Sequence, residues 1–231
     1  MVEKDWKIIS VGGSIIIPKT GFDLPFLKNF RELILKFVRN GERFILIVGG
    51  GATARQYQQT ASSLSDLTIE ELDWIGIGAT IMNANFIKYL FKDFAYKDVI
   101  TNPLKKVRTD RPIIVGAGWK PGCSTDQDAV LLAKTYKVKE VINLSNIGYV
   151  YDKDPNVYKA ARVIEQIDWT TFRRDVVGSE WEAGKNAPFD PIASQTAEKL
   201  GLKVSILQGT KLDQVEKAIN GEKFEGTVIE P

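Results

Sequence analysis

The sequence predicts an α/β fold in which helices cover both faces of a mostly parallel sheet. Three observations support this prediction. Short apolar, β-branched runs recur along the 231 residues, amphipathic helical patterns separate them, and three of the runs end in glycine-rich turns. Continuous apolar strands that alternate with amphipathic helices are typical of βαβ units, and ligands of such sheets bind beyond the carboxyl ends of the strands.

The expected elements follow one another in order. Strands are expected at 7–11 (KIISV), 44–48 (FILIV), 112–115 (PIIV), 140–144 (EVINL) and 203–207 (KVSIL). Helices are expected at 24–40, 68–91, 126–136 and 191–201. The least regular segment is 151–190, which is interpreted as a subdomain boundary or a mobile lid. One continuous domain over 1–231 is the preferred interpretation.

Composition and charge narrow the chemistry. Because 31 basic and 29 acidic residues give a net charge of +2, neither nucleic acid nor a membrane surface is expected as the main partner. The sequence shows no signal peptide and no apolar run long enough to span a bilayer, so a cytoplasmic location is expected. It contains no histidine and only one cysteine, Cys123. This composition excludes serine–histidine hydrolases and the usual zinc sites, and no metal-ligating residue is assigned.

Three glycine-rich turns follow strands. They are SVGGS (10–14), VGGGATAR (48–55) and VGAGWKPGCSTD (115–126). Glycine lets backbone N–H groups approach an anion closely, and it adopts the positive φ angles that anion-binding loops need. Three such turns at one edge of a sheet predict that several phosphate groups bind together. Arg55, one turn into the helix that follows the second turn, offers a planar charged fork for phosphate oxygens.

Two alternatives concern individual turns. Gly49, Gly51 and Ala54 fit the GxGxxA spacing of a dinucleotide fingerprint, but that pattern usually follows the first strand and leaves the other turns unexplained. No P-loop pattern occurs in the sequence. Ser124, in PGCSTD, and Gln127 have the spacing of a helix cap. This stretch could therefore simply cap the helix, as an alternative to binding a phosphate group at the helix start.

In combination, these motifs closely resemble the amino acid kinase superfamily, and within it the uridylate (UMP) kinases of archaeal type. The match runs in order over nearly the whole chain: VGGS (11–14), IVGGGATARQY (47–57), LDWIGIGATIMNAN (72–85), GAGWKPGCSTDQDAVLLA (116–133), NLSNIGYVYDKDP (143–155), FDPIASQTAEKLGLK (189–203) and GTVIEP (226–231). The resemblance implies an amino acid kinase-like fold, a three-layer α/β/α sandwich. It also implies transfer of the γ-phosphoryl group of ATP to UMP with Mg²⁺, and a homohexamer built as a trimer of dimers.

The resemblance further implies roles for individual residues. The acceptor-nucleotide part is about 1–135 and the ATP-binding part about 136–231. UMP would be bound by Gly50, Gly51, Arg55, Asp73, Gly118 and Thr125. ATP would be bound by Gly12, Gly13, Ser14, Ser145, Asn146, Tyr151 and Asp154. The catalytic residues would be Arg55, which holds the UMP phosphate, and Asp190, which aligns a cation or a loop at the reaction centre.

The sequence departs from the family pattern at a few positions. Ser10 stands where many members have a lysine, which leaves Lys7, Lys120 and Lys185 as candidate cations for the transferring group. Ile81 replaces a frequent arginine, and Gly148 with Tyr149 replaces an Asp-Gly pair. Alternative hypotheses are therefore a kinase of the same fold with a carboxylate, carbamate or isoprenyl phosphate acceptor, and a catalytically silent nucleotide-binding subunit.

Overall fold

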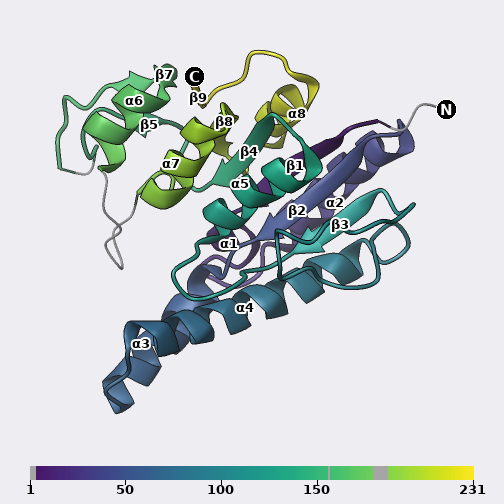
Figure 1. The fold of residues 1–231 in the computed structure, drawn as a ribbon, viewed down its shortest axis with the longest axis horizontal. Coiled ribbons are helices and arrows are strands. Elements are labelled where there is room, and N and C mark those ends of the chain that lie inside the picture. The colour runs from purple at the N-terminus through teal and green to yellow at the C-terminus, as the bar shows by residue number, and fades with distance from the viewer. Residues whose placement is uncertain (1–3, 156, 179–186) are drawn as a thin grey trace.

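The computed structural model describes residues 4–155, 157–178 and 187–231. Within this part, seven strands form one sheet in the order β3-β2-β1-β4-β8-β9-β7 (Figure 1). The strands of this sheet are β1 (Trp6–Val11), β2 (Arg43–Val48), β3 (Ile113–Gly116), β4 (Glu140–Ser145), β7 (Gln166–Asp168), β8 (Lys203–Gln208) and β9 (Thr227–Glu230). A separate antiparallel hairpin contains β5 (Val150–Tyr151) and β6 (Val163–Ile164).

The five predicted strands are β3, β2, β1, β4 and β8, which are consecutive in the sheet, and each prediction is correct to within one residue at either end. Strands β3, β2, β1, β4 and β8 are parallel to one another. Strand β9 runs antiparallel to β8, and β7 is parallel to β9. Parallel pairing brings the carboxyl ends of these strands, and the turns that follow them, to one edge of the sheet.

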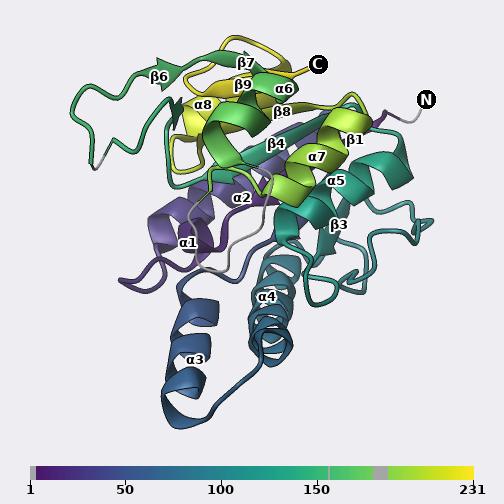
Figure 2. The same cartoon turned by 60° about the vertical axis from the view of Figure 1, so that its left-hand side comes forward.

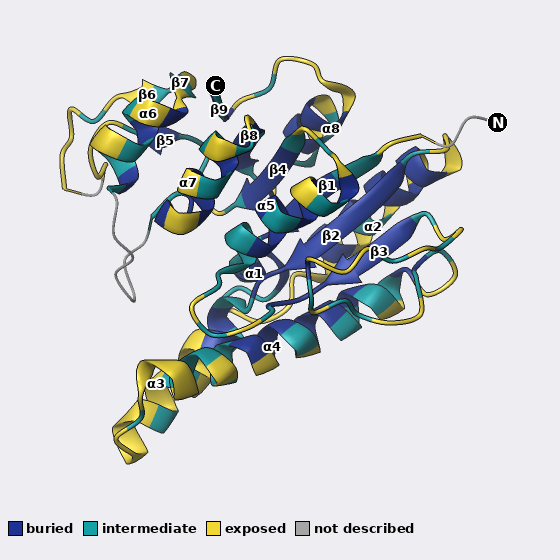
Figure 3. Ribbon diagram, in the orientation of Figure 1, coloured by how far each residue is buried: buried dark blue, intermediate teal, exposed yellow. Residues whose placement is uncertain are grey.

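Helices cover both faces of the sheet. Successive residues of one strand, such as Ile8 and Ile9, enter different hydrophobic cores. The first core includes side chains of α2 (Leu24–Arg39), α4 (Ile69–Leu90) and α8 (Leu212–Asn220). The second includes side chains of α5 (Thr125–Tyr136), α6 (Trp169–Phe172) and α7 (Pro191–Lys199). Figure 3 shows the central strands buried between these layers. The predicted three-layer α/β/α sandwich is confirmed.

The α-helices are α1 (Gly13–Ile16), α2 (Leu24–Arg39), α3 (Gly51–Leu64), α4 (Ile69–Leu90), α5 (Thr125–Tyr136), α6 (Trp169–Phe172), α7 (Pro191–Lys199) and α8 (Leu212–Asn220). A π-helical turn, Arg173–Val177, continues α6. The four predicted helices are α2, α4, α5 and α7. Short polar caps fix where they begin: Ser124 accepts a hydrogen bond from the backbone N–H of Gln127, and Thr68 forms a capping box with Glu71.

The helices α3 and α4 form a hairpin that projects from the sheet (Figure 2). Their junction with the sheet lies at the carboxyl ends of β2 and β3, beside the predicted phosphate loops. In the irregular segment 151–190, the described residues form the end of β5, then β6, β7, α6 and the π-helical turn. Residues 179–186 of that segment, including Lys185, lie outside the described residues. No helix among the described residues is long and apolar enough to cross a membrane.

Candidate active site

A cavity of about 420 Å³ opens between the α3–α4 hairpin and the loop before α5. Its walls come from the start of α3, from one side of α4 and from the loop that follows β3. The lining residues include Gly50, Gly51, Arg55, Gln58, Ile69, Leu72, Asp73, Thr80, Gly118, Lys120, Thr125 and Asp190. Because the cavity lies beyond the carboxyl ends of parallel strands, it has the position that ligands take in such sheets.

The floor of the cavity is backbone that only glycine can form. A Cβ atom on Gly13 would lie 2.2 Å from the backbone nitrogen of Gly51, so the turns after β1 and β2 touch directly. Gly51 also has a φ of +63°. From α4, the amide of Asn83 donates hydrogen bonds to the carbonyl oxygens of Gly49 (2.9 Å) and Gly50 (3.1 Å). The peptide groups of this floor are therefore held in one orientation.

The loop after β3 is fixed to its surroundings by three backbone N–H groups. Gly118 donates to the hydroxyl of Thr80 (2.9 Å), Trp119 donates to the carboxylate of Asp128 (3.2 Å), and Gly122 donates to the carboxylate of Asp73 (2.8 Å). Thr80 and Asp73 both belong to α4, so the loop runs along this helix. The wall of the cavity is thus preformed.

Two acidic residues meet behind the cavity. The Asp126 carboxylate accepts hydrogen bonds from Asn143 (3.2 Å), from the backbone N–H of Asp190 (3.3 Å) and, at 3.5 Å, from Ser10. Removal from water, together with the negative charge of Asp190, raises the pKa of Asp126 to about 7.

Asp190 is only 5% exposed and caps α7, where it accepts a 2.6 Å hydrogen bond from the backbone N–H of Ala193. Its burial raises the pKa of its carboxyl above the usual range. Asp128, buried in α5, has a pKa raised to about 7, mainly by burial, and its carboxylate accepts the thiol hydrogen bond of Cys123. Burial also raises the pKa of the Cys123 thiol, so this residue is not an activated nucleophile.

All the residues expected to bind the acceptor, and both expected catalytic residues, line this one cavity: Gly50, Gly51, Arg55, Asp73, Gly118, Thr125 and Asp190. They come from segments 140 residues apart in the sequence. The structure therefore brings the predicted set together, while the role of each residue stays a prediction.

The residues expected to bind ATP lie at the neighbouring strand ends. Gly12, Gly13 and Ser14 follow β1, and the backbone N–H of Gly12 donates to the carbonyl oxygen of Leu144 (2.9 Å), next to Ser145. Asn146 follows β4, Tyr151 lies in β5, and the backbone carbonyl of Asp154 accepts hydrogen bonds from the next turn of chain. Because Gly13 touches Gly51, the turns after β1 and β4 adjoin the floor of the cavity.

The three candidate lysines have different positions. Lys7 lies near the amino end of β1, where its ammonium donates to the carbonyl oxygen of Ile219 (3.2 Å) and lies 3.8 Å from Glu42. It is at the opposite edge of the sheet from the glycine turns and cannot serve the transferring group. Lys120 lines the cavity. Lys185 lies outside the described residues.

Sequence reasoning missed the residues that position the loops. Thr80 and Asn83 are buried polar side chains on α4. On α5, Asp128 supports the loop, and Asp126 accepts hydrogen bonds from Asn143 and from the backbone N–H of Asp190. One signal was available: polar residues at helical spacing inside the apolar pattern of 68–91 are costly to bury unless they have hydrogen-bond partners.

Comparison of the chain with known proteins identifies its family. The sequence model of the amino acid kinase family matches residues 5–208, which is most of the chain. The chain belongs to the amino acid kinase family. A uridylate kinase of Methanobrevibacter smithii is 32% identical over 225 residues, covering 96% of this chain and 98% of that protein. A uridylate kinase of Sulfurisphaera tokodaii is 30% identical over 217 residues, covering 91% and 95%.

Solved structures of amino acid kinase relatives share the fold. The crystal structure of uridylate kinase from Archaeoglobus fulgidus has a TM-score of 0.80 at 28% identity and covers 96% of this chain and 99% of that chain. The UMP kinase of Bacillus anthracis, at 18% identity, has a TM-score of 0.78 and covers 98% and 96%, which supports the fold alone. The resemblance predicted from the sequence motifs is confirmed.

Proposed function

We propose that this member of the amino acid kinase family is a UMP kinase. It transfers the γ-phosphoryl group of ATP to UMP, giving UDP and ADP, and so serves pyrimidine nucleotide biosynthesis. The observation that carries the proposal is the gathering of Arg55, Asp73, Thr125 and Asp190 around one cavity at the glycine turns. The near full-length similarity to proteins named uridylate kinase supports the same acceptor.

In this proposal, UMP occupies the cavity with its phosphate on the glycine floor. Arg55 and the backbone N–H groups of Gly50 and Gly51 bind phosphate oxygens, and the amino end of α5 at Thr125 adds the positive end of a helix dipole. Asp73 binds the ribose hydroxyls. The acceptor phosphate is already ionised near neutral pH, so the reaction needs no general base, in keeping with a sequence without histidine.

The rate then comes from alignment and from fixed donors where charge develops. The acceptor part, about 1–135, supplies the lining of the cavity apart from Asp190. The ATP part, about 136–231, supplies Asp190 and also Ser145, Asn146, Tyr151 and Asp154 around the adenine and ribose. Gly12, Gly13 and Ser14 lie along the ATP phosphates. Asp190 orients the reacting groups from its fixed position as the cap of α7.

Magnesium would arrive with ATP, bound mainly through phosphate oxygens, and would neutralise charge on the transferring group. The chemistry of the site fits this arrangement, because backbone N–H groups and Arg55 leave phosphate oxygens free to bind a hard cation. Within the described residues, no group of three His, Cys, Asp or Glu side chains could hold a metal ion by itself. The cytoplasmic location stays a prediction.

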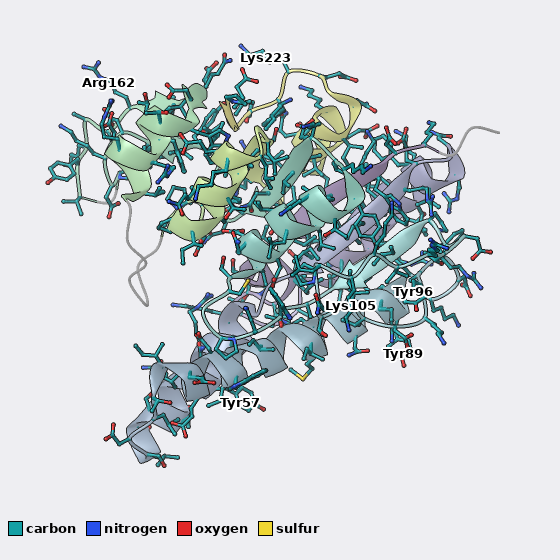
Figure 4. The ribbon with its side chains drawn as sticks, in the orientation of Figure 1. Tyr57, Tyr89, Tyr96, Lys105, Arg162 and Lys223 are labelled. Carbon is teal, nitrogen blue, oxygen red and sulfur yellow. The ribbon has the colours of Figure 1, made fainter. Side chains whose placement is uncertain are left out.

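We also propose that the enzyme is a homo-oligomer, with the hexamer built from dimers as the expected form. One face of α4 exposes Trp74 (52%), Met82 (53%) and Tyr89 (66%), and Figure 4 labels Tyr89 at the carboxyl end of this helix. These side chains recur at helical spacing on a helix that flanks the active site. A second copy of the chain that covers them would remove a large apolar surface from water.

The test of the proposed activity is ADP release from the purified chain with ATP and Mg²⁺, offered UMP, CMP, dUMP, AMP and GMP in turn. We expect the highest turnover with UMP, and its loss in Asp190→Asn. A carboxylate and an isoprenyl phosphate are offered in parallel, and turnover with one of these alone would move the enzyme to another acceptor class. Binding of UMP and ATP without any turnover would identify a silent nucleotide-binding subunit instead.

A further inference from the structure

Lys120 lies at the mouth of the acceptor cavity, and its position follows from the bonds of its loop. Gly118 is bound to Thr80, beside the floor, because a Cβ atom on Gly50 would lie 3.5 Å from Cγ2 of Thr80. Gly122 is bound to Asp73, seven residues earlier on the same helix. At 1.5 Å of rise per residue, the loop therefore climbs roughly 10 Å along α4 from the floor towards the mouth.

Lys120 begins the turn at the upper end of this climb. The N–H of Cys123 donates to the carbonyl oxygen of Lys120 (3.1 Å), and Pro121 and Gly122, the latter with φ +73°, are the residues that a type II turn requires. The backbone that carries the Lys120 side chain is thus fixed at both ends. Its side chain is exposed and lines the cavity.

The charge of Lys120 is available to a ligand. Its ammonium lies 4.3 Å from the centre of the Trp119 ring. Among the ion pairs of the described residues, none includes Lys120. A cation held by an aromatic face and left without a carboxylate can turn towards a ligand acceptor atom at small cost.

The height of Lys120 above the floor of the cavity determines which part of the bound nucleotide it contacts. The phosphate lies at the floor with Gly50, Gly51 and Arg55, and the ribose lies at the level of Asp73. Beyond the ribose, the wall contains the apolar side chains of Ile69 and Leu72, which suit a flat base. Lys120 lines the same cavity from the loop after β3, two residues before Gly122, which is bound at the level of Asp73.

We infer that Lys120 is a specificity-determining residue that donates a hydrogen bond to the O4 carbonyl of uracil. This inference rests on the proposed UMP kinase function. An ammonium group has three donors and no acceptor, so it binds the carbonyl of uracil but faces the amino group that cytosine carries at the same ring position. The site therefore selects UMP against CMP through Lys120.

The test measures dissociation constants for UMP and CMP by calorimetry without ATP, and kcat/KM for both with ATP and Mg²⁺. A charge-assisted hydrogen bond predicts that Lys120→Met lowers the preference for UMP over CMP about tenfold or more. Lys120→Gln, which can donate or accept, should be intermediate, and Lys120→Glu should favour CMP. Lys134→Met removes one positive charge at an exposed position on α5, as Lys120→Met does in its loop, and should keep the wild-type preference.

The possible outcomes separate the inference from the proposed function. An equal loss for UMP and CMP in Lys120→Met would place the ammonium on the phosphate and overturn the inference. An unchanged ratio would overturn it too. Wild-type protein that binds UMP and CMP without phosphorylating either would refute the kinase activity alone, because the ratio of dissociation constants still tests Lys120. Thermal unfolding of each variant verifies that the fold is intact.

Discussion

The carboxylate of Asp73 accepts a hydrogen bond from the backbone N–H of Gly122 at 2.8 Å. This bond joins the two walls of the acceptor cavity, because Asp73 belongs to α4 and Gly122 to the loop before α5. One oxygen of the carboxylate holds the loop, and the other is available to the ribose in the proposed complex. Asp73 therefore links the shape of the cavity to recognition of the sugar.

Removing this link should weaken acceptor binding more than catalysis. We expect Asp73→Ala to raise KM for UMP about tenfold or more, because the loop loses its anchor and the ribose loses its acceptor. Asp73→Asn keeps an oxygen for Gly122 and should show a smaller rise. Steady-state kinetics with UMP as the varied substrate measures both, and Glu70→Ala, an exposed change on the same helix, serves as the control. Equal KM values for wild type and Asp73→Ala would refute the link.

Asn83 offers a test of the glycine floor. In Asn83→Ala, the carbonyl oxygens of Gly49 and Gly50 lose their side-chain donor, and we expect the free energy of unfolding to fall by about 1–3 kcal/mol, with kcat falling as well. Asn85→Ala is the matched control, because the side chain of Asn85 donates to the carbonyl oxygen of Ile81 in its own helix. Urea unfolding and turnover should separate the two variants. Similar losses in both would show that the floor needs no support from α4.

The exposed face of α4 predicts an assembly. Met82→Glu puts a charge in the middle of this apolar face, so we expect sedimentation to show dissociation into smaller species, at little cost to the folded monomer. Val163→Glu, an exposed apolar position (47%) on β6, should leave the assembly unchanged. A wild-type protein that sediments as a monomer would contradict the proposed homo-oligomer.

The central sheet could be predicted from the sequence because its strands are short, continuous and apolar. The runs at 44–48 and 203–207 differ from their observed strands only by a residue at an end. The glycine turns also predicted where ligands bind, since glycine at strand ends has a local backbone cause. The cavity residues from Gly50 to Asp190 came from matching motifs, because no local pattern tells which distant loops will meet.

Other parts carried weak signals. The strands β5, β6 and β7 have only two or three residues each, so they have no measurable periodicity, and β9 is recognisable only through its pairing with β8 and β7. The contact of Asp126 with Asp190 joins residues 64 positions apart. Lys7 and Lys120 could not be distinguished by sequence, because their difference lies in which edge of the sheet each occupies.

Substitution can separate the structural role of Asp190, as the cap of α7, from its proposed role in catalysis. Because its side chain caps α7, we expect Asp190→Ala to lose about 1 kcal/mol of stability, whereas Asn is itself a good cap and should lose less. Both variants should lose UMP kinase turnover. Asp23→Ala removes the corresponding cap of α2, where Asp23 accepts from Phe26, and should lose stability but keep turnover. Turnover retained in Asp190→Asn would reduce Asp190 to a cap.

The carboxyl group of Asp126 predicts an unusual pH dependence of stability. Its pKa, raised by burial and by Asp190 from an ordinary 3.8 to about 7, means that the folded protein keeps a proton that the unfolded chain releases above pH 4. The free energy of unfolding contributed by this group is therefore fully present below about pH 4 and is lost as the pH rises towards 7 and beyond. We expect urea unfolding of the wild type to show a fall between pH 5 and pH 8 to which Asp126 contributes about 1–3 kcal/mol, with Asp128, whose pKa is also raised to about 7, adding to it. Asp126→Asn cannot titrate, so its slope should be shallower even if its stability is lower throughout. Asp66→Asn, an exposed change in the loop between α3 and α4, should keep the wild-type slope. Parallel slopes for wild type and Asp126→Asn would show that the Asp126 carboxyl is already ionised at pH 5.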